Sequence, residues 1–176
     1  MSDISNFIAE ETPPKANAMI NTFRAFGYNL QTAIADIIDN SISAKATTVW
    51  LNYTWEGSES WISILDDGTG MDKAELVDAM TPGSKDPNDE RDENDLGRFG
   101  LGLKTSSFSQ CKILTVATKK QGEQLLKRCW NLDHVNQTGK WSLLDYISDN
   151  SFLEGLDKLK SGTLVLWQSL DRLVGN

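Results

Sequence analysis

The sequence predicts a single α/β domain, on three observations. Apolar residues from Leu30 to Ile38 recur at intervals of three and four, which is the spacing of a helix packed on a core. Residues 47–55 alternate between two faces as a β-strand does, and a short apolar stretch follows at 61–65. The chain has 176 residues, 39% of them hydrophobic, which is enough to bury one core.

The amino-terminal part is expected to be an extended arm followed by two helices. Residues 1–14 are polar and end in two prolines, so we assign them to an arm and residues 15–176 to the folded domain. Helices are expected at 15–26 and 29–44, with Gly27 ending the first.

The centre of the chain is expected to form a hairpin, a short helix and a long loop. The strands at 47–55 and 61–65 are separated by a Gly-Ser turn, and Asp72 can cap a helix that runs to about Met80. Residues 81–98 are rich in Pro, Gly, Asp and Asn. A solvated loop of this length is uncommon inside a compact domain unless it has a task, such as covering a site.

The remaining elements are less strongly patterned. Residues 132–160 show little periodicity, and we see no repeat and no linker between two domains. We expect a helix at 102–110 and strands at 112–119, 124–131 and 163–167.

Composition restricts the function classes. The 25 acidic and 17 basic residues give a net charge of −8, which argues against direct nucleic-acid binding, so such a partner would require other domains. Cys111 and Cys129 lack metal-ligand spacing and are expected to be free thiols. Without a signal segment or a run of about 20 apolar residues, we expect a cytoplasmic, soluble protein with no membrane partner.

The helix at 29–44 carries the first candidate site. Asp36 and Asn40 lie one turn apart at the edge of the apolar stripe. A carboxylate beside a carboxamide at a core margin suits metal and water. A half-buried helix with two satisfied polar side chains explains the same pattern.

Residues 66–71 (Asp-Asp-Gly-Thr-Gly-Met) place a carboxylate at a strand end, followed by two glycines. Gly68 and Gly70 would let the backbone approach a flat ligand, and Asp66 can accept a hydrogen bond from an exocyclic amine such as that of adenine. An ordinary turn built from Asp and Gly remains the alternative.

Residues 97–105 (Gly-Arg-Phe-Gly-Leu-Gly-Leu-Lys-Thr) follow the long loop and open a helix. Glycines at a helix start expose backbone N–H groups to an anion, and phosphate is the natural candidate. The P-loop pattern fails by one residue because Leu103 separates Gly102 from Lys104, and the dinucleotide fingerprint also fails.

A fourth segment, residues 161–167, places the Thr163 hydroxyl at the start of an apolar strand. In this order, the four segments resemble the ATP-binding domain shared by gyrase B, Hsp-ninety chaperones, sensor histidine kinases and MutL (the GHKL superfamily). The sequences of segments 36–41, 66–71 and 97–104 are most similar to those of the MORC-like and chaperone-like branch. The resemblance implies a two-layer α/β sandwich, the Bergerat fold, with a mixed, mostly antiparallel sheet covered on one face by helices.

The resemblance also implies ATP and Mg²⁺ as cofactors and assigns roles by position. Asn40 would coordinate Mg²⁺, Asp66 would receive the adenine amino group, Thr163 would support that contact, and residues 81–99 would form a lid over the nucleotide. Lys104 would reach a phosphate, although a lysine in the first turns of a helix can instead be solvated. The other nucleotide-binding positions implied are Gly68, Gly70, Met71, Gly97, Gly100, Leu101 and Gly102.

Two positions depart from the pattern of hydrolysing relatives. The general base is usually glutamate, but this chain has Asp36, which is shorter by one C–C bond, so slow hydrolysis is expected. Ser43 stands where relatives often carry aspartate, which puts in doubt a hydrogen-bonded network near the adenine.

These features lead to one main hypothesis and two alternatives. The main hypothesis is a Mg²⁺-dependent ATPase switch in which ATP binding closes the lid and drives homodimerisation, with residues 1–14 crossing to the partner. Because the chain is acidic, nucleotide affinity is expected to depend steeply on magnesium. The alternatives are a non-hydrolysing sensor of ATP and ADP, and a histidine-kinase-type phosphotransfer domain with His134 as the one histidine available.

Overall fold

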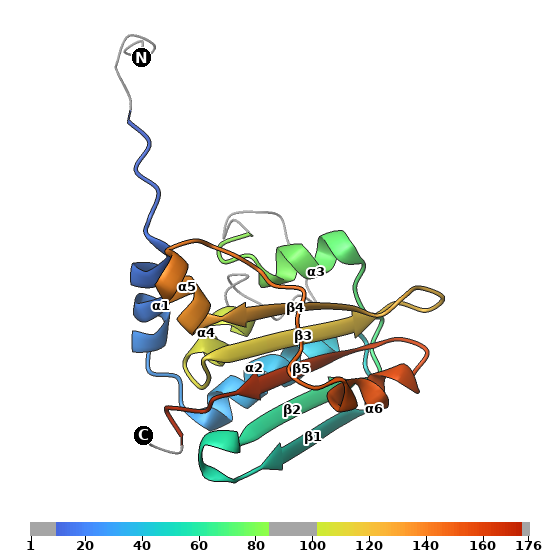
Figure 1. The fold of residues 1–176 in the computed structure, drawn as a ribbon. Helices are drawn as coiled ribbons and strands as arrows, with labels where there is room; N and C mark the ends of the chain where they lie inside the picture. The colour runs from blue at the N-terminus through green and yellow to red at the C-terminus, as the bar shows by residue number, and fades with distance from the viewer. Residues whose placement is uncertain (1–9, 85–101, 174–176) are drawn as a thin grey trace.

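The computed structural model describes residues 10–84 and 102–173. Five strands form one sheet in the order β1-β2-β5-β3-β4, and all four neighbouring pairs run antiparallel, so the described sheet is antiparallel rather than mixed (Figure 1). The strands are β1 (Val49–Thr54), β2 (Trp61–Asp66), β3 (Ile113–Lys119), β4 (Leu126–Asn131) and β5 (Gly162–Gln168).

Helices cover one face of this sheet and enclose the main core with it. Each strand alternates, so Ile62, Val116 and Trp167 point into this core from three different strands. The free thiol of Cys111 is buried in the same core, as expected for a small apolar residue. The helices on this side are α1 (Ala16–Ala25), α2 (Leu30–Ser43), α3 (Lys73–Met80), α4 (Gly102–Phe108) and α5 (Leu132–Thr138).

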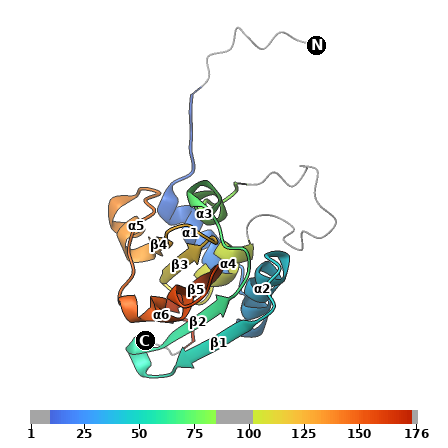
Figure 2. The ribbon, with the colours of Figure 1, turned by 90° about the vertical axis from the view of Figure 1, so that its right-hand side faces the viewer.

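The other face of the sheet also has a cover. Two short helices, η2 (Asn150–Leu153) and α6 (Glu154–Asp157), pack against Leu164 and Leu166 of β5. Figures 1 and 2 show α2 and α6 on opposite sides of the sheet. The main helical layer on one face is thus as expected, and the weakly patterned region 132–160 adds the two short helices η2 and α6 on the other face.

The α/β sandwich itself is confirmed, and the predicted hairpin forms. β1 pairs with β2 from Val49↔Asp66 to Thr54↔Trp61, and η1 (Gly57–Glu59) connects them. α3 begins with the expected cap, since Asp72 accepts hydrogen bonds from two backbone N–H groups. None of the helices in the described ranges is both long and apolar enough to cross a membrane.

Two sequence expectations lie outside what the structure describes. Most of the arm (residues 1–9) and most of the expected lid (residues 85–99 of 81–99) are not among the described residues, nor are residues 100 and 101. Gly97, Gly100 and Leu101 therefore cannot be placed relative to the site.

Candidate functional site

A cavity of about 520 Å³ lies between the sheet and the helices α2, α3 and α4. Its size is in the range that holds a small organic ligand. Of the predicted site residues, the cavity is lined by Asn40, Asp66, Gly70, Met71, Gly102, Lys104 and Thr163, together with Ser43. Four sequence segments predicted separately are thus brought together by the fold.

Asp66 is the most constrained polar group of the cavity. Asp66 is the last residue of β2, and it is 6% exposed. One carboxylate oxygen accepts hydrogen bonds from the N–H groups of Gly68 (2.9 Å) and Thr163 (3.2 Å), and the other accepts from the Ser41 hydroxyl (2.9 Å). Burial raises the pKa of Asp66 above its usual value, although these hydrogen bonds oppose the shift.

Thr118 connects the strand end to the loop after β2. Its hydroxyl oxygen accepts from the Met71 N–H (2.9 Å) and lies 3.1 Å from both the Gly162 carbonyl and the Thr163 hydroxyl. The predicted supporting residue, Thr163, is therefore held by a buried neighbour from β3. This arrangement fixes the position of Met71 and Thr163 in the cavity wall.

Gly68 and Gly70 are each required by a close protein neighbour. Gly70 has φ +69°, and a Cβ built there would lie 2.1 Å from the Lys119 carbonyl oxygen. A Cβ on Gly68 would lie 2.9 Å from Ala44. Both glycines therefore have a packing role beside any role in admitting a ligand, and Gly68 is not among the residues that line the cavity.

Asp67, the second carboxylate of the motif, has a structural role. It accepts hydrogen bonds from the Thr47 hydroxyl (2.6 Å), the Thr47 N–H (2.7 Å) and the Thr48 N–H (2.9 Å). These donors lower the pKa of Asp67 to about 2. Asp67 thus fastens the segment between α2 and β1 to the loop that carries the glycines.

Asn40 and Asp36 lie on α2, but they occupy different positions relative to the cavity. Asn40 lines it and is exposed, so its amide oxygen is available to a ligand. Asp36 is not among the described lining residues, although its Oδ2 lies 3.8 Å from where a Cβ of Gly102 would be. Burial and the neighbouring Asp39 raise the pKa of Asp36, while a hydrogen bond from Tyr28 lowers it.

Lys104 is buried in the wall of the cavity rather than solvated. The residue is 2% exposed, and its Nζ donates a hydrogen bond to the Ala79 carbonyl of α3 (2.9 Å). The solvated alternative for this lysine is therefore wrong. Its ammonium group is held where α3 meets α4, and Glu75 and Asp78 of α3 line the same cavity.

The sequence interpretation missed three residues that shape the site: Ser41, Thr118 and Tyr28. Ser41 follows Asn40 directly, and in a helix this places it about 100° around the axis, toward the core. A hydroxyl at a core-facing position is a signal that a polar partner is near. Thr118 carries no comparable signal, because threonine is common in strands. Tyr28 lies before the N-cap of α2, where the helical pattern does not extend.

The residues present are compatible with magnesium bound through a nucleotide. Among the described residues, no cluster of three or more His, Cys, Asp or Glu side chains is arranged to hold a metal. Mg²⁺ keeps several waters and takes few protein ligands when phosphates supply the others. The exposed amide oxygen of Asn40 fits such a single ligand.

Comparison with known proteins agrees with the site. A family model described as "Histidine kinase-, DNA gyrase B-, and HSP90-like ATPase" matches residues 28–163. Among curated proteins, the chain is similar to the ATPase morc-1 of Caenorhabditis elegans, with 32% identity over 91 residues. That match covers 52% of this chain but 10% of the relative, so the chain spans about a tenth of that protein, and it supports the MORC-like branch. With its α/β sandwich and its cavity on the helical face, this chain belongs to the histidine kinase, gyrase B and HSP90-like (GHKL) ATPase family.

Proposed function

We propose that the cavity binds ATP and that the adenine amino group donates a hydrogen bond to Asp66. The observation that carries the proposal is the buried Asp66 carboxylate, oriented by three donors in the wall of a ligand-sized cavity. A carboxylate oxygen only accepts hydrogen bonds, and a hydrogen bond to an ionised acceptor is stronger than a neutral one, so the exocyclic N–H of adenine is a suitable donor. Thr163 supports the same edge of the base.

The phosphates would lie toward α2 and α4, where Asn40 and Lys104 face the cavity. Asn40 would supply one oxygen to Mg²⁺, and the metal would neutralise phosphate charge that the acidic chain otherwise repels. Lys104 would turn from the Ala79 carbonyl to a phosphate oxygen. By resemblance to the family, Gly97, Gly100 and Gly102 form the proposed phosphate cradle, and Leu101 is a further proposed nucleotide-binding position.

Asp36 is the proposed general base for slow hydrolysis. Its raised pKa favours proton acceptance, and Tyr28 restrains its orientation. Because aspartate is shorter than glutamate, its carboxylate stands back from the cavity, and a misplacement of about 1 Å lowers a rate on the order of a hundredfold. We further propose that lid closure by residues 81–99 and homodimerisation follow ATP binding.

A second candidate function is a nucleotide sensor that does not hydrolyse ATP. One observation favours it: Asp36 is absent from the described residues that line the cavity, although Asn40 one turn later is present. The phosphotransfer alternative receives no such support. His134 lies on α5, a helix of seven residues that contacts β4, at the opposite edge of the sheet from β1.

Isothermal titration with ATP tests the binding proposal. We expect ATP to bind at one site when magnesium is present, and to bind that site much more weakly when magnesium is replaced by EDTA. Asn40→Ala should abolish that difference, and Asn136→Ala, an exposed asparagine on α5, should leave it unchanged. If the titration with magnesium present gives no heat of binding, the proposal is overturned.

A phosphate-release assay at saturating ATP separates the two candidate functions. Slow release that Asp36→Ala removes, without weakening ATP binding, supports the ATPase. Complete absence of release from the unaltered chain, with binding intact, supports the sensor and refutes Asp36 as a base.

A further inference from the structure

The two edges of the sheet differ in whether another segment of the chain pairs with them. At the β4 edge, Cys129 exchanges backbone hydrogen bonds of 2.8 and 2.9 Å with Leu144, and Lys127 and Arg128 form ion pairs with Asp145. At the opposite edge, β1 pairs with β2 alone among the described elements, and Figures 1 and 2 show β1 as the outermost strand. One row of β1 backbone N–H and C=O groups therefore has no partner strand in the described chain.

β1 also lacks the features that keep an open edge from pairing. Free edges usually carry charged residues, proline or a bulge. The strand Val-Trp-Leu-Asn-Tyr-Thr contains no charge and no proline, and it pairs with β2 without a bulge over all six residues. Large apolar side chains remain exposed on both of its faces: Leu51 (45%), Tyr53 (68%) and Trp50 (39%).

We propose that β1 pairs antiparallel with β1 of a second copy of this chain across a two-fold axis, so that two five-stranded sheets become one continuous sheet. This contact requires no nucleotide and is separate from the homodimerisation that we propose to follow ATP binding. An uncharged strand is suited to pair with itself, because no like charges meet in the ladder. Each β1 hydrogen-bonds to the other, and the exposed apolar side chains gain cross-strand neighbours.

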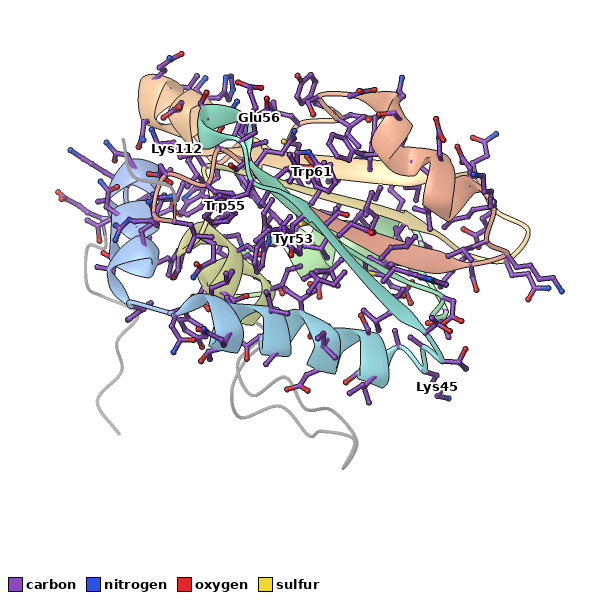
Figure 3. All side chains as sticks on the ribbon, turned by 90° about the horizontal axis from the view of Figure 1, so that it is seen from below. Lys45, Tyr53, Trp55, Glu56, Trp61 and Lys112 are labelled. Carbon is purple, nitrogen blue, oxygen red and sulfur yellow. The ribbon has the colours of Figure 1, made fainter. Side chains whose placement is uncertain are left out.

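The charges that flank β1 also fit a second copy. Lys45 precedes the strand and Glu56 and Glu59 follow it, and Figure 3 shows Lys45 and Glu56 at opposite ends. Antiparallel pairing places the basic end of one copy beside the acidic end of the other. Asp67, the carboxylate near the basic end, is already engaged by Thr47 and Thr48.

Side-chain alternation restricts the register, and the match between opposed side chains then favours one. In a continuous antiparallel sheet, opposed residues share a face, so odd positions meet odd and even meet even. Placing Asn52 opposite Asn52 on the axis sets Leu51 against Tyr53 and Trp50 against Thr54. Apolar side chains then face apolar or β-branched ones, and the one amide of the strand faces its own copy.

Disulfide trapping tests this register directly. Opposed Cα atoms in an antiparallel pair lie about 4.5–5.5 Å apart, within the range of a disulfide. Asn52→Cys should therefore give a covalent dimer under mild oxidation without nucleotide, and the native Cys111 and Cys129 are buried and should not interfere. Asn136→Cys, also at an exposed position but on α5, is the control and should give no covalent dimer.

Sedimentation without nucleotide tests the pairing independently of any cross-link. The unaltered chain should show concentration-dependent dimerisation, which Leu51→Lys should remove, while Tyr146→Lys, at a similarly exposed residue outside the sheet, should not. A monomer at all concentrations, or a dimer that survives Leu51→Lys, would overturn the proposal. Cross-linking through Leu51→Cys instead of Asn52→Cys would overturn the register. None of these results bears on ATP binding, which is measured separately.

Discussion

Replacing Asp66 by asparagine should separate ligand binding from fold stability. The change keeps the shape of the side chain and one acceptor oxygen for the Gly68 and Thr163 N–H groups. The other position becomes an NH₂ group, toward which the Ser41 hydroxyl can rotate to accept. The group that we propose to accept from adenine is then replaced by a donor.

The magnitudes follow from this geometry. In the variant, the new side-chain NH₂ group would face the adenine amino group, so two donors would meet without an acceptor. This costs about 2–3 kcal/mol, which corresponds to a roughly 30- to 150-fold weaker Kd for ATP. Fold stability should not fall in parallel. The raised pKa of Asp66 means that the ionised form is disfavoured in the folded state, so at neutral pH removing the charge leaves the free energy of unfolding equal or higher.

Calorimetry measures the affinity for ATP, and thermal unfolding measures the stability of the fold. We expect weaker ATP binding with an unchanged or raised Tm for Asp66→Asn. In the unaltered chain, ATP affinity should fall on acidification through a pH above 3.8, the ordinary aspartate value, because the proposed acceptor is then protonated. Equal ATP affinity in the variant, or a large loss of Tm, would refute the reasoning.

Three further changes test separate parts of the account. Gly70→Ala should lower the free energy of unfolding by about 2–4 kcal/mol in chemical denaturation, because the new Cβ meets the Lys119 carbonyl at positive φ. Asp36→Asn should leave the Kd for ATP unchanged in calorimetry while removing phosphate release. Thr118→Val should destabilise the fold by about 1–3 kcal/mol, measured by the same denaturation, since the Met71 N–H loses its acceptor.

Each of these changes has a matched control or a result that contradicts it. Gly122→Ala shares the positive φ of Gly70 but has open space around it, so it should cost about 1 kcal/mol and isolate the clash. Equal losses for both glycine variants would show that the close approach to Lys119 does not matter. Unchanged phosphate release in Asp36→Asn would exclude it as the base, and an unchanged stability of Thr118→Val would show that its hydroxyl is dispensable.

Much of the fold could be predicted because local patterns and long-range packing agree. The apolar stripe of α2 and the alternation of β1 and β2 each indicate the element that forms, and Asp72 caps α3 as its position indicates. The region 132–160 could not be predicted in the same way. Its helices are held by contacts with the sheet, such as those of Leu153 and Leu156, rather than by their own periodicity.

The candidate site shows the same division. The sequence indicates which segments carry polar groups and glycines, and the fold gathers those segments around one cavity. The partners that set the chemistry come from elsewhere in the chain: Thr118 is far in sequence from Met71, and Gly70 is required by Lys119. Such contacts depend on strand order, which local sequence patterns do not specify.

The most direct test of the central claim is a crystal structure of the chain with a non-hydrolysable ATP analogue and magnesium. The account predicts the adenine amino group within hydrogen-bond distance of Asp66 and Mg²⁺ about 2.1 Å from the Asn40 side-chain oxygen. A nucleotide bound outside the cavity, or one whose base does not touch Asp66, would contradict it.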